Sequence, residues 1–263
     1  RMASSRSASV RPVAFVGVEN GVRRLFVRAL GEDVARVVPG TDHVRAFAIS
    51  PDGEEAAYWI DTELRRVRLA GGPSALIHLN VKDVAGLDWG PAGIVMSARS
   101  LAVVRPDGSG WIQVTNNQQL ERDASPIWMP DGRTIVYTQY EKQWTSGDER
   151  LMVVEAVAGG KPRELLKNAA HPQLLAPGHL TFLQSPLTAF PDRELVSTDR
   201  QGRTTSIGAP RRGYRSHVAL SPDGRQLGVS VQTAGSIQAF AFDLARGILT
   251  RIGESLDGEV TLA

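Results

Sequence analysis

The tetrapeptide Ser50-Pro51-Asp52-Gly53 recurs almost unchanged twice, as MPDG at residues 129–132 and as SPDG at residues 221–224. Two degenerate copies lie between these, GPAG at 90–93 and APGH at 176–179. The motif prolines are 40, 39, 47 and 45 residues apart, namely Pro51, Pro91, Pro130, Pro177 and Pro222. Proline presets φ, aspartate can bond its own backbone, and glycine accepts a positive φ, so each copy predicts a tight turn. Such a period is typical of the four-stranded blade of a β-propeller.

Short runs of apolar alternation flank each turn, as expected for strands. A third strand and then a glycine turn follow in every unit. The third strands are expected at 25–30, 64–69, 101–105, 151–156, 194–198 and 238–243. A fourth strand closes each unit, for example 75–79. The sequence therefore predicts an all-β fold built from six four-stranded antiparallel blades.

The two ends of the chain are predicted to complete one blade together. The chain opens near residues 12–18 on a strand of the kind that follows the motif turn. It ends near 258–263 on a strand of the kind that precedes this turn. A closed ring leaves no unpaired edge, whereas the alternative is an arbitrary cut from a longer propeller. Residues 1–11 are expected to be a linker and 12–263 a single domain. The predicted blades are 12–40 plus 257–263, 43–79, 83–116, 122–168, 169–209 and 214–253.

Composition excludes several classes of protein. Hydrophobic residues make up 42% and charged residues 22% of the chain, which is typical of a globular domain. The formal net charge of +2 argues against a dedicated nucleic-acid binder. The absence of cysteine excludes disulfides and thiol chemistry. No apolar run is long enough to predict a membrane span.

The turns, with Trp89 and Trp128 two residues before the motif proline, resemble the TolB-type (WD40-like) repeat. Longer segments resemble the propeller that follows the kinase domain and membrane helix in some bacterial serine/threonine protein kinases. These are RRLFVRALGEDVARVVPGTD (23–42), APGHLTFL (176–183) and the stretch from LSPDGRQLGVS to FDLARGILTRI (220–252). The resemblance implies a sensory or scaffolding domain, extracytoplasmic in the parent protein, without catalysis of its own. The chain has no kinase catalytic motif, and two of its turns have lost their aspartate.

One ring of polar residues is the candidate site. In a propeller all first strands start at one mouth of the central channel, so residues six to eight places before the motif prolines, with His217 one place nearer, should gather there. The candidates for ligand binding are His43, Arg45, Asp83, Asp123, His171, Arg215, His217, Asp257 and Glu259. Histidine and carboxylate groups suit Zn²⁺ and similar divalent metals. The metal-ligand candidates are His43, Asp83, His171, His217 and Glu259. The alternative is an ordinary wet, polar channel mouth without metal.

Aromatic residues fall into two groups. Trp89 and Trp128 occupy equivalent positions and are predicted to pack between blades. Trp144 and Phe190 lie in two longer hydrophilic loops and are candidate contact residues for a partner.

Two functions remain open at this point. The leading hypothesis is a non-catalytic module that binds a small molecule or a protein. The alternative is a divalent-metal-dependent hydrolase acting on a phosphotriester, ester or lactone at the channel mouth, by analogy of fold. The expected assembly is a monomer or a strand-swapped or head-to-tail dimer.

Overall fold

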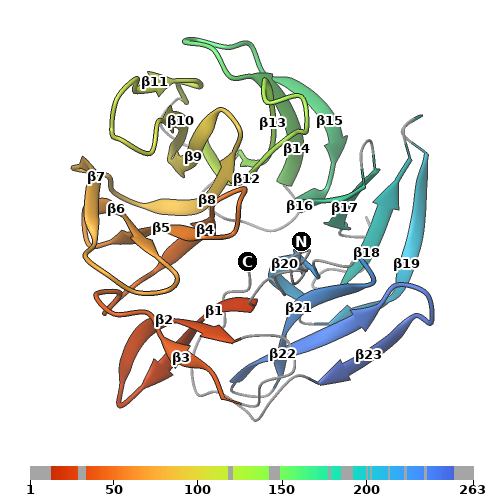
Figure 1. Cartoon of the computed structure of the whole chain (residues 1–263). Coiled ribbons are helices and arrows are strands. Elements are labelled where there is room, and N and C mark those ends of the chain that lie inside the picture. Colours follow the sequence, from red (N-terminus) through yellow and green to blue (C-terminus); the bar gives the residue numbers. More distant parts are fainter. Residues whose placement is uncertain are drawn as a thin grey trace, which may run out of the picture.

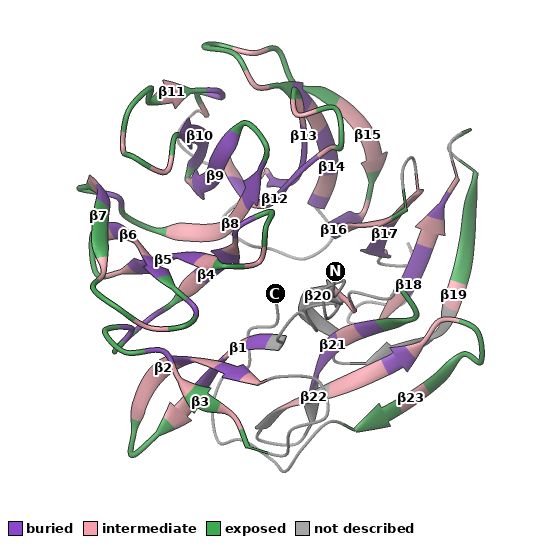
Figure 2. Cartoon of the chain, viewed as in Figure 1, coloured by how far each residue is buried: buried purple, intermediate pink, exposed green. Residues whose placement is uncertain are grey.

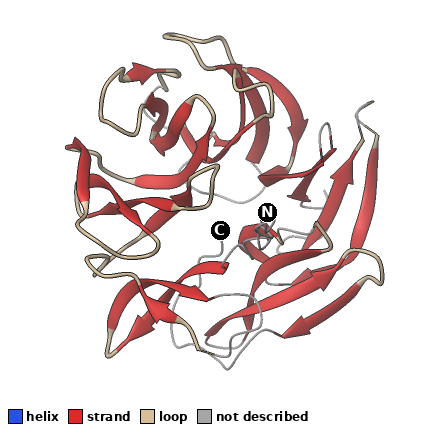
Figure 3. Ribbon diagram, in the orientation of Figure 1, coloured by secondary structure: helices blue, strands red, loops and turns tan. Residues whose placement is uncertain are grey.

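A computed structural model describes residues 13–28, 34–117, 121–141, 149–176, 179–184, 192–199, 201, 203–212, 214–221, 224–233 and 236–251. Six antiparallel sheets are arranged around a central axis, as Figure 1 shows. Every regular element in these ranges is a strand (Figure 3). The predicted six-bladed β-propeller is therefore confirmed. No helix in the described part of the chain could span a membrane.

Each blade is a meander of consecutive strands running from the axis outwards. The first blade holds β1 (Val13–Glu19), β2 (Val22–Arg28) and β3 (Arg36–Val37). The second and third hold β4 (Ala46–Ile49), β5 (Glu55–Ile60), β6 (Glu63–Arg68), β7 (Ala75–Leu79), β8 (Val84–Gly90), β9 (Gly93–Ala98), β10 (Ser100–Val104) and β11 (Ile112–Gln113). The fourth and fifth hold β12 (Arg122–Trp128), β13 (Thr134–Tyr140), β14 (Glu149–Glu155), β15 (Arg163–Lys167), β16 (Ala169–Ala176), β17 (His179–Gln184), β18 (Asp192–Thr198) and β19 (Thr204–Arg212). The sixth holds β20 (Tyr214–Leu220), β21 (Gln226–Thr233), β22 (Ser236–Asp243) and β23 (Ile248–Arg251).

The first blade has three strands in the described residues, in the order β1-β2-β3. The fourth strand predicted for it, near 258–263, lies outside the described residues. Closure of the ring by that segment stays a prediction.

The repeated motif forms the expected turn between the first and second strands of a blade. In the first copy the Gly53 amide donates to the Ser50 carbonyl (2.8 Å) and Ser50 Oγ bonds to Asp52 Oδ1 (2.5 Å). The Gly132 amide makes the same backbone bond to Met129 (3.0 Å). Gly53 and Gly132 both have a positive φ, at 77° and 64°. The glycine thus supplies the left-handed residue that the turn requires.

The hydrophobic core lies between consecutive blades. Each cluster of buried residues draws on two neighbouring blades; one contains Trp59 of β5 with Trp89 of β8, and the next contains Leu101 of β10 with Trp128 of β12. Figure 2 shows the buried residues on the inner and middle strands and exposed residues on outer strands such as β7 and β23. Trp89 and Trp128 are 8% and 6% exposed, so their predicted packing between blades is confirmed.

An equivalent hydrogen bond occurs at two junctions, each between a blade and the next one along the chain. Thr41 Oγ1 accepts from the amide of Leu25 in β2 (3.0 Å), and Thr115 Oγ1 accepts from the amide of Leu101 in β10 (2.8 Å). We call these the Thr41 and Thr115 clips. They lie at the end of the disc where inner strands begin and where second strands turn into third strands. This end is called the mouth face below.

Four inner strands contain a β-bulge near the mouth face. Register shifts lie between Val84 and Leu87 in β8, Ala124 and Ile127 in β12, Ala170 and Gln173 in β16, and Tyr214 and Val218 in β20. A bulge places two residues opposite one and turns their side chains out of the regular alternation. The side chains near the channel mouth therefore do not follow the alternation expected from sequence.

Candidate functional site at the channel mouth

Three of the predicted mouth residues are exposed. His43 and Arg45 precede β4, and Asp83 precedes β8. The His43 amide donates to the Arg23 carbonyl (2.7 Å), which fixes the backbone at the junction. The Arg45 guanidinium lies 5.8 Å from the centre of the Trp59 ring, a cation–π contact. These side chains border the mouth face, and neither the His43 hydrogen bond nor the Arg45 contact joins one of them to another.

Asp123 is fully buried and belongs to a blade junction. Its Oδ2 accepts from Thr115 Oγ1 (2.6 Å) and its Oδ1 from Gln139 Nε2 (3.2 Å). Its own amide donates to the Arg99 carbonyl (2.8 Å). Burial raises the pKa of Asp123 to about 6, although hydrogen bonds from Thr115, Asn117 and Gln139 lower it. The carboxyl group therefore extends the Thr115 clip.

His171 is 5% exposed and links the fourth and fifth blades. Its Nδ1 lies 2.8 Å from Ser125 Oγ in the bulge of β12, and its Nε2 lies 3.4 Å from the hydroxyl of Tyr140 in β13. The His171 amide donates to Thr138 Oγ1 (2.8 Å). Both the main chain and the ring of His171 are thus bound to the neighbouring blade.

A buried ion pair extends this polar group. Arg193 Nη2 of β18 lies 2.7 Å from Glu149 Oε1 of β14, and the two side chains are 13% and 1% exposed. Burial raises the pKa of Tyr140 to about 12, while the Arg193 charge lowers it and Glu149 raises it further. Tyr140 therefore stays protonated at neutral pH. We call Ser125, Tyr140, Glu149, His171 and Arg193 the junction cluster.

The side chains of the remaining predicted site residues lie outside the described part of the structure. Arg215 and His217 belong to β20, but their side chains lie outside the described residues. Asp257, Glu259, Trp144 and Phe190 are also outside them. Within the described ranges, no three histidine or acidic residues are grouped as metal ligands. The donors described at the mouth therefore do not by themselves form a metal site, and a metal at the mouth stays a prediction.

Sequence reasoning did not find Ser125, Tyr140, Glu149 or Arg193. One signal was available, because Ser125-Pro126 and His171-Pro172 each place a proline inside an inner strand. Proline is tolerated in a strand mainly at an edge or a bulge. The two dipeptides therefore marked the bulges that bring Ser125 and His171 together.

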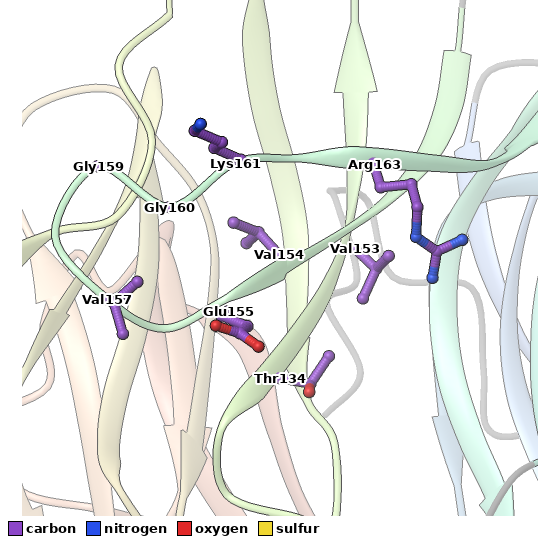
Figure 4. A pocket seen from close by; sticks show the side chains of 9 residues that line it. All are labelled: Thr134, Val153, Val154, Glu155, Val157, Gly159, Gly160, Lys161 and Arg163. Atoms are coloured by element: carbon purple, nitrogen blue, oxygen red, sulfur yellow. The ribbon is translucent and has the colours of Figure 1, made fainter.

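A separate hollow of about 580 Å³ lies over β14 and β15 (Figure 4). Its polar lining residues are Thr134, Glu155, Lys161 and Arg163. It adjoins the turn at Gly159-Gly160, which is at the opposite end of the blade from the mouth face. It is therefore separate from the junction cluster.

Solved structures superpose on nearly the whole described fold. TolB from Acinetobacter baumannii superposes with a TM-score of 0.74 at 15% identity, over 95% of this chain and 65% of that one. The chain has the fold of a TolB-type six-bladed propeller. It spans about two thirds of the length of that TolB, and at this identity the likeness concerns the fold alone.

Two further solved structures are also similar to this TolB-like chain. A chain of a nidogen/laminin complex has a TM-score of 0.69 and 12% identity, with 95% and 96% of the two chains covered. A putative 6-phosphogluconolactonase from Bacteroides uniformis has a TM-score of 0.59 and 14% identity, with 94% and 83% covered. No protein-family model and no curated protein sequence matches the chain. The resemblance to kinase-linked propellers thus stays a sequence-based expectation.

Proposed function

We propose that this TolB-like propeller is a non-catalytic sensory or scaffold module that binds a small molecule or a protein at its mouth face. The junction cluster is the observation that carries the proposal. It concentrates hydroxyl, imidazole, carboxylate and guanidinium groups where two blades meet. An extracytoplasmic location is part of the proposal and rests on the resemblance described from sequence.

The position of the cluster favours recognition. Tyr140 ends β13 and Glu149 begins β14, while Gln184 ends β17 and Asp192 begins β18. These residues are the anchor points of the two long loops that contain Trp144 and Phe190. Loops held by a rigid scaffold often carry binding residues. A ligand on this face would meet the loop bases and the partly exposed Ser125, while Tyr140, Glu149 and His171 are themselves buried.

The test is a thermal-shift screen of the purified chain with sugars, nucleotides, amino acids and short peptides of both charges. Hits are measured by calorimetry against His171→Gln and Arg193→Gln, with Arg203→Ala as the matched control. Arg203 is 79% exposed and lies in another turn. A hit weakened at least about tenfold by folded cluster variants but not by Arg203→Ala supports the site. Ligands whose binding is unchanged in the cluster variants would show that the binding site is not at the junction cluster.

The second candidate is a hydrolase of an ester or lactone, which the likeness to a putative lactonase and the His171 imidazole favour. A divalent metal would activate water in the version predicted from sequence. His43, Asp83 and His171 would need His217 or Glu259 to complete a ligand set. Metal analysis of the purified chain, with ester hydrolysis measured before and after chelation, tests this version.

A further inference from the structure

Ser125 and His171 are joined across a blade junction in the geometry of a nucleophile and its base. Ser125 Oγ lies 2.8 Å from His171 Nδ1, within the distance range used in general-base catalysis. The two residues come from different blades and are far apart in sequence. Both are in bulges near the mouth face, where Ser125 is partly exposed and His171 is buried.

General-base action on Ser125 requires one tautomer of His171. Nδ1 can accept the Ser125 proton only if Nε2 carries the ring proton. Nε2 then faces the oxygen of Tyr140 at 3.4 Å. The hydrogen bond from the His171 backbone amide to Thr138 Oγ1 fixes the backbone from which the side chain extends. The ring is thereby held with Nδ1 facing Ser125 Oγ.

Both residues also have a left-handed backbone. Ser125 has φ of 47° and His171 has φ of 57°. Such a conformation costs a non-glycine residue about 1–3 kcal/mol. It also occurs at His43 and Asp83, which precede the inner strands β4 and β8. A single neutral hydrogen bond contributes only about 1 kcal/mol. The Ser125–His171 bond alone therefore does not offset the strain of two residues.

We propose that Ser125 is a nucleophile, with His171 as its general base, for acyl transfer from a carboxylic ester or lactone. This inference rests on the hydrolase candidate above and replaces its metal-activated water by a serine. Ser125 Oγ forms a bond to the carbonyl carbon while its proton passes to His171 Nδ1. The ester C–O bond then breaks, and the leaving alkoxide takes that proton. Water then attacks the acyl carbon while its proton passes to Nδ1. The bond between Ser125 Oγ and the acyl carbon breaks, and Oγ takes that proton.

The test uses a fluorophosphonate probe, which labels activated serines, with the labelled peptide identified by mass spectrometry. The variants are Ser125→Ala, His171→Gln and, as the matched control, Ser109→Ala in an exposed turn. Circular dichroism checks that each variant folds. Hydrolysis of p-nitrophenyl acetate is measured on the same samples with and without EDTA.

Labelling of Ser125 that persists in EDTA, is lost in Ser125→Ala, and slows at least about 100-fold in His171→Gln supports the inference. Ser109→Ala should label like the unmodified chain. Hydrolysis abolished by EDTA without labelling would overturn the serine mechanism and leave the metal version. Absence of both labelling and hydrolysis would remove the hydrolase candidate, while the ligand screen decides separately on binding.

Discussion

A Cβ atom on Gly90 would lie 2.4 Å from Cγ of Trp128, so the indole of one blade occupies the space left by a missing side chain in the blade before it. The Trp128 amide donates to Oδ2 of Asp88 (2.7 Å), which lies in β8 two residues before Gly90. Burial raises the pKa of Asp88 despite this bond and a second one from Trp89. Side chain and main chain of Trp128 are therefore both fixed by β8.

We expect Gly90→Ala to destabilise the fold by about 1–3 kcal/mol, because it overpacks this contact. Trp128→Ala should cost about 3–5 kcal/mol, the range for removing a buried large side chain. In the double variant the contacts with Cγ and Cδ1 of Trp128 are gone, but the Cβ of residue 128 still lies 2.7 Å from the added Cβ, so the added cost should fall without vanishing. Urea unfolding of the four proteins measures the cycle. Additive costs would contradict the contact.

A matched pair of tyrosines gives a second prediction. Tyr58 and Tyr137 both lie seven residues after their motif prolines and both are fully buried. The Tyr58 hydroxyl bonds to the Gly40 carbonyl (2.9 Å) and Ser74 Oγ (2.7 Å), whereas the Tyr137 hydroxyl has no partner among the described residues.

Tyr58→Phe should therefore cost about 1 kcal/mol, because it leaves bonding groups of the neighbouring segments unsatisfied. Tyr137→Phe should be neutral or stabilising, since it removes an unsatisfied buried hydroxyl. Thermal melts of both variants provide the comparison. Equal losses at the two sites would show that Tyr137 has a partner after all.

Asp123 should make stability depend on pH. Its folded-state pKa is about 6, above the unfolded value of 3.8, so the folded state holds the proton more tightly. Stability should consequently fall as the pH rises from about 4 to about 6, by on the order of 2–3 kcal/mol. Asp123→Asn should remove this fall and become the more stable protein above pH 6.

Asp131 provides the control of opposite sign. Hydrogen bonds from Thr134 and the Arg133 amide lower its pKa, so its contribution is lost as the pH falls. Asp131→Asn should flatten the acid side of the profile instead. Denaturant titrations at several pH values separate the two; a profile unchanged by Asp123→Asn would rule out a raised pKa.

Closure of the ring is tested by deleting residues 257–263. In the described part of the chain β1 pairs with β2 only, so its inner edge has open backbone groups. If 259–262 pairs there, the deletion exposes that edge and should lower the melting temperature by well over the 2–4 °C that about 1 kcal/mol gives in a domain of this size. A change within a degree or two would contradict closure. Size-exclusion chromatography shows whether strands are exchanged between two chains.

The repeated turns were enough to predict the blades. Pro and Gly set the backbone of each turn locally, and the fixed offset from Pro130 placed Trp128 in the core. Local chemistry at a constant spacing transfers directly from sequence to structure.

The arrangement at the mouth could not be predicted in the same way. A strand alternates its side chains with period two, but a bulge adds a residue and resets the alternation. His171 lies in such a bulge, whereas His43 precedes its strand. His43 instead corresponds to Asp123, because their amides donate to Arg23 and Arg99 at equivalent junctions. Offsets counted from the prolines do not show this.

The Thr41 and Thr115 clips bear on how such a ring evolves. Each clip takes its bonding groups from one blade and the segment that leads into the next. A tandem duplication of one repeat would therefore bring its own junction chemistry with it. A propeller built this way can change its blade number in the gene by copying a unit, and only the wedge angle between blades has to readjust.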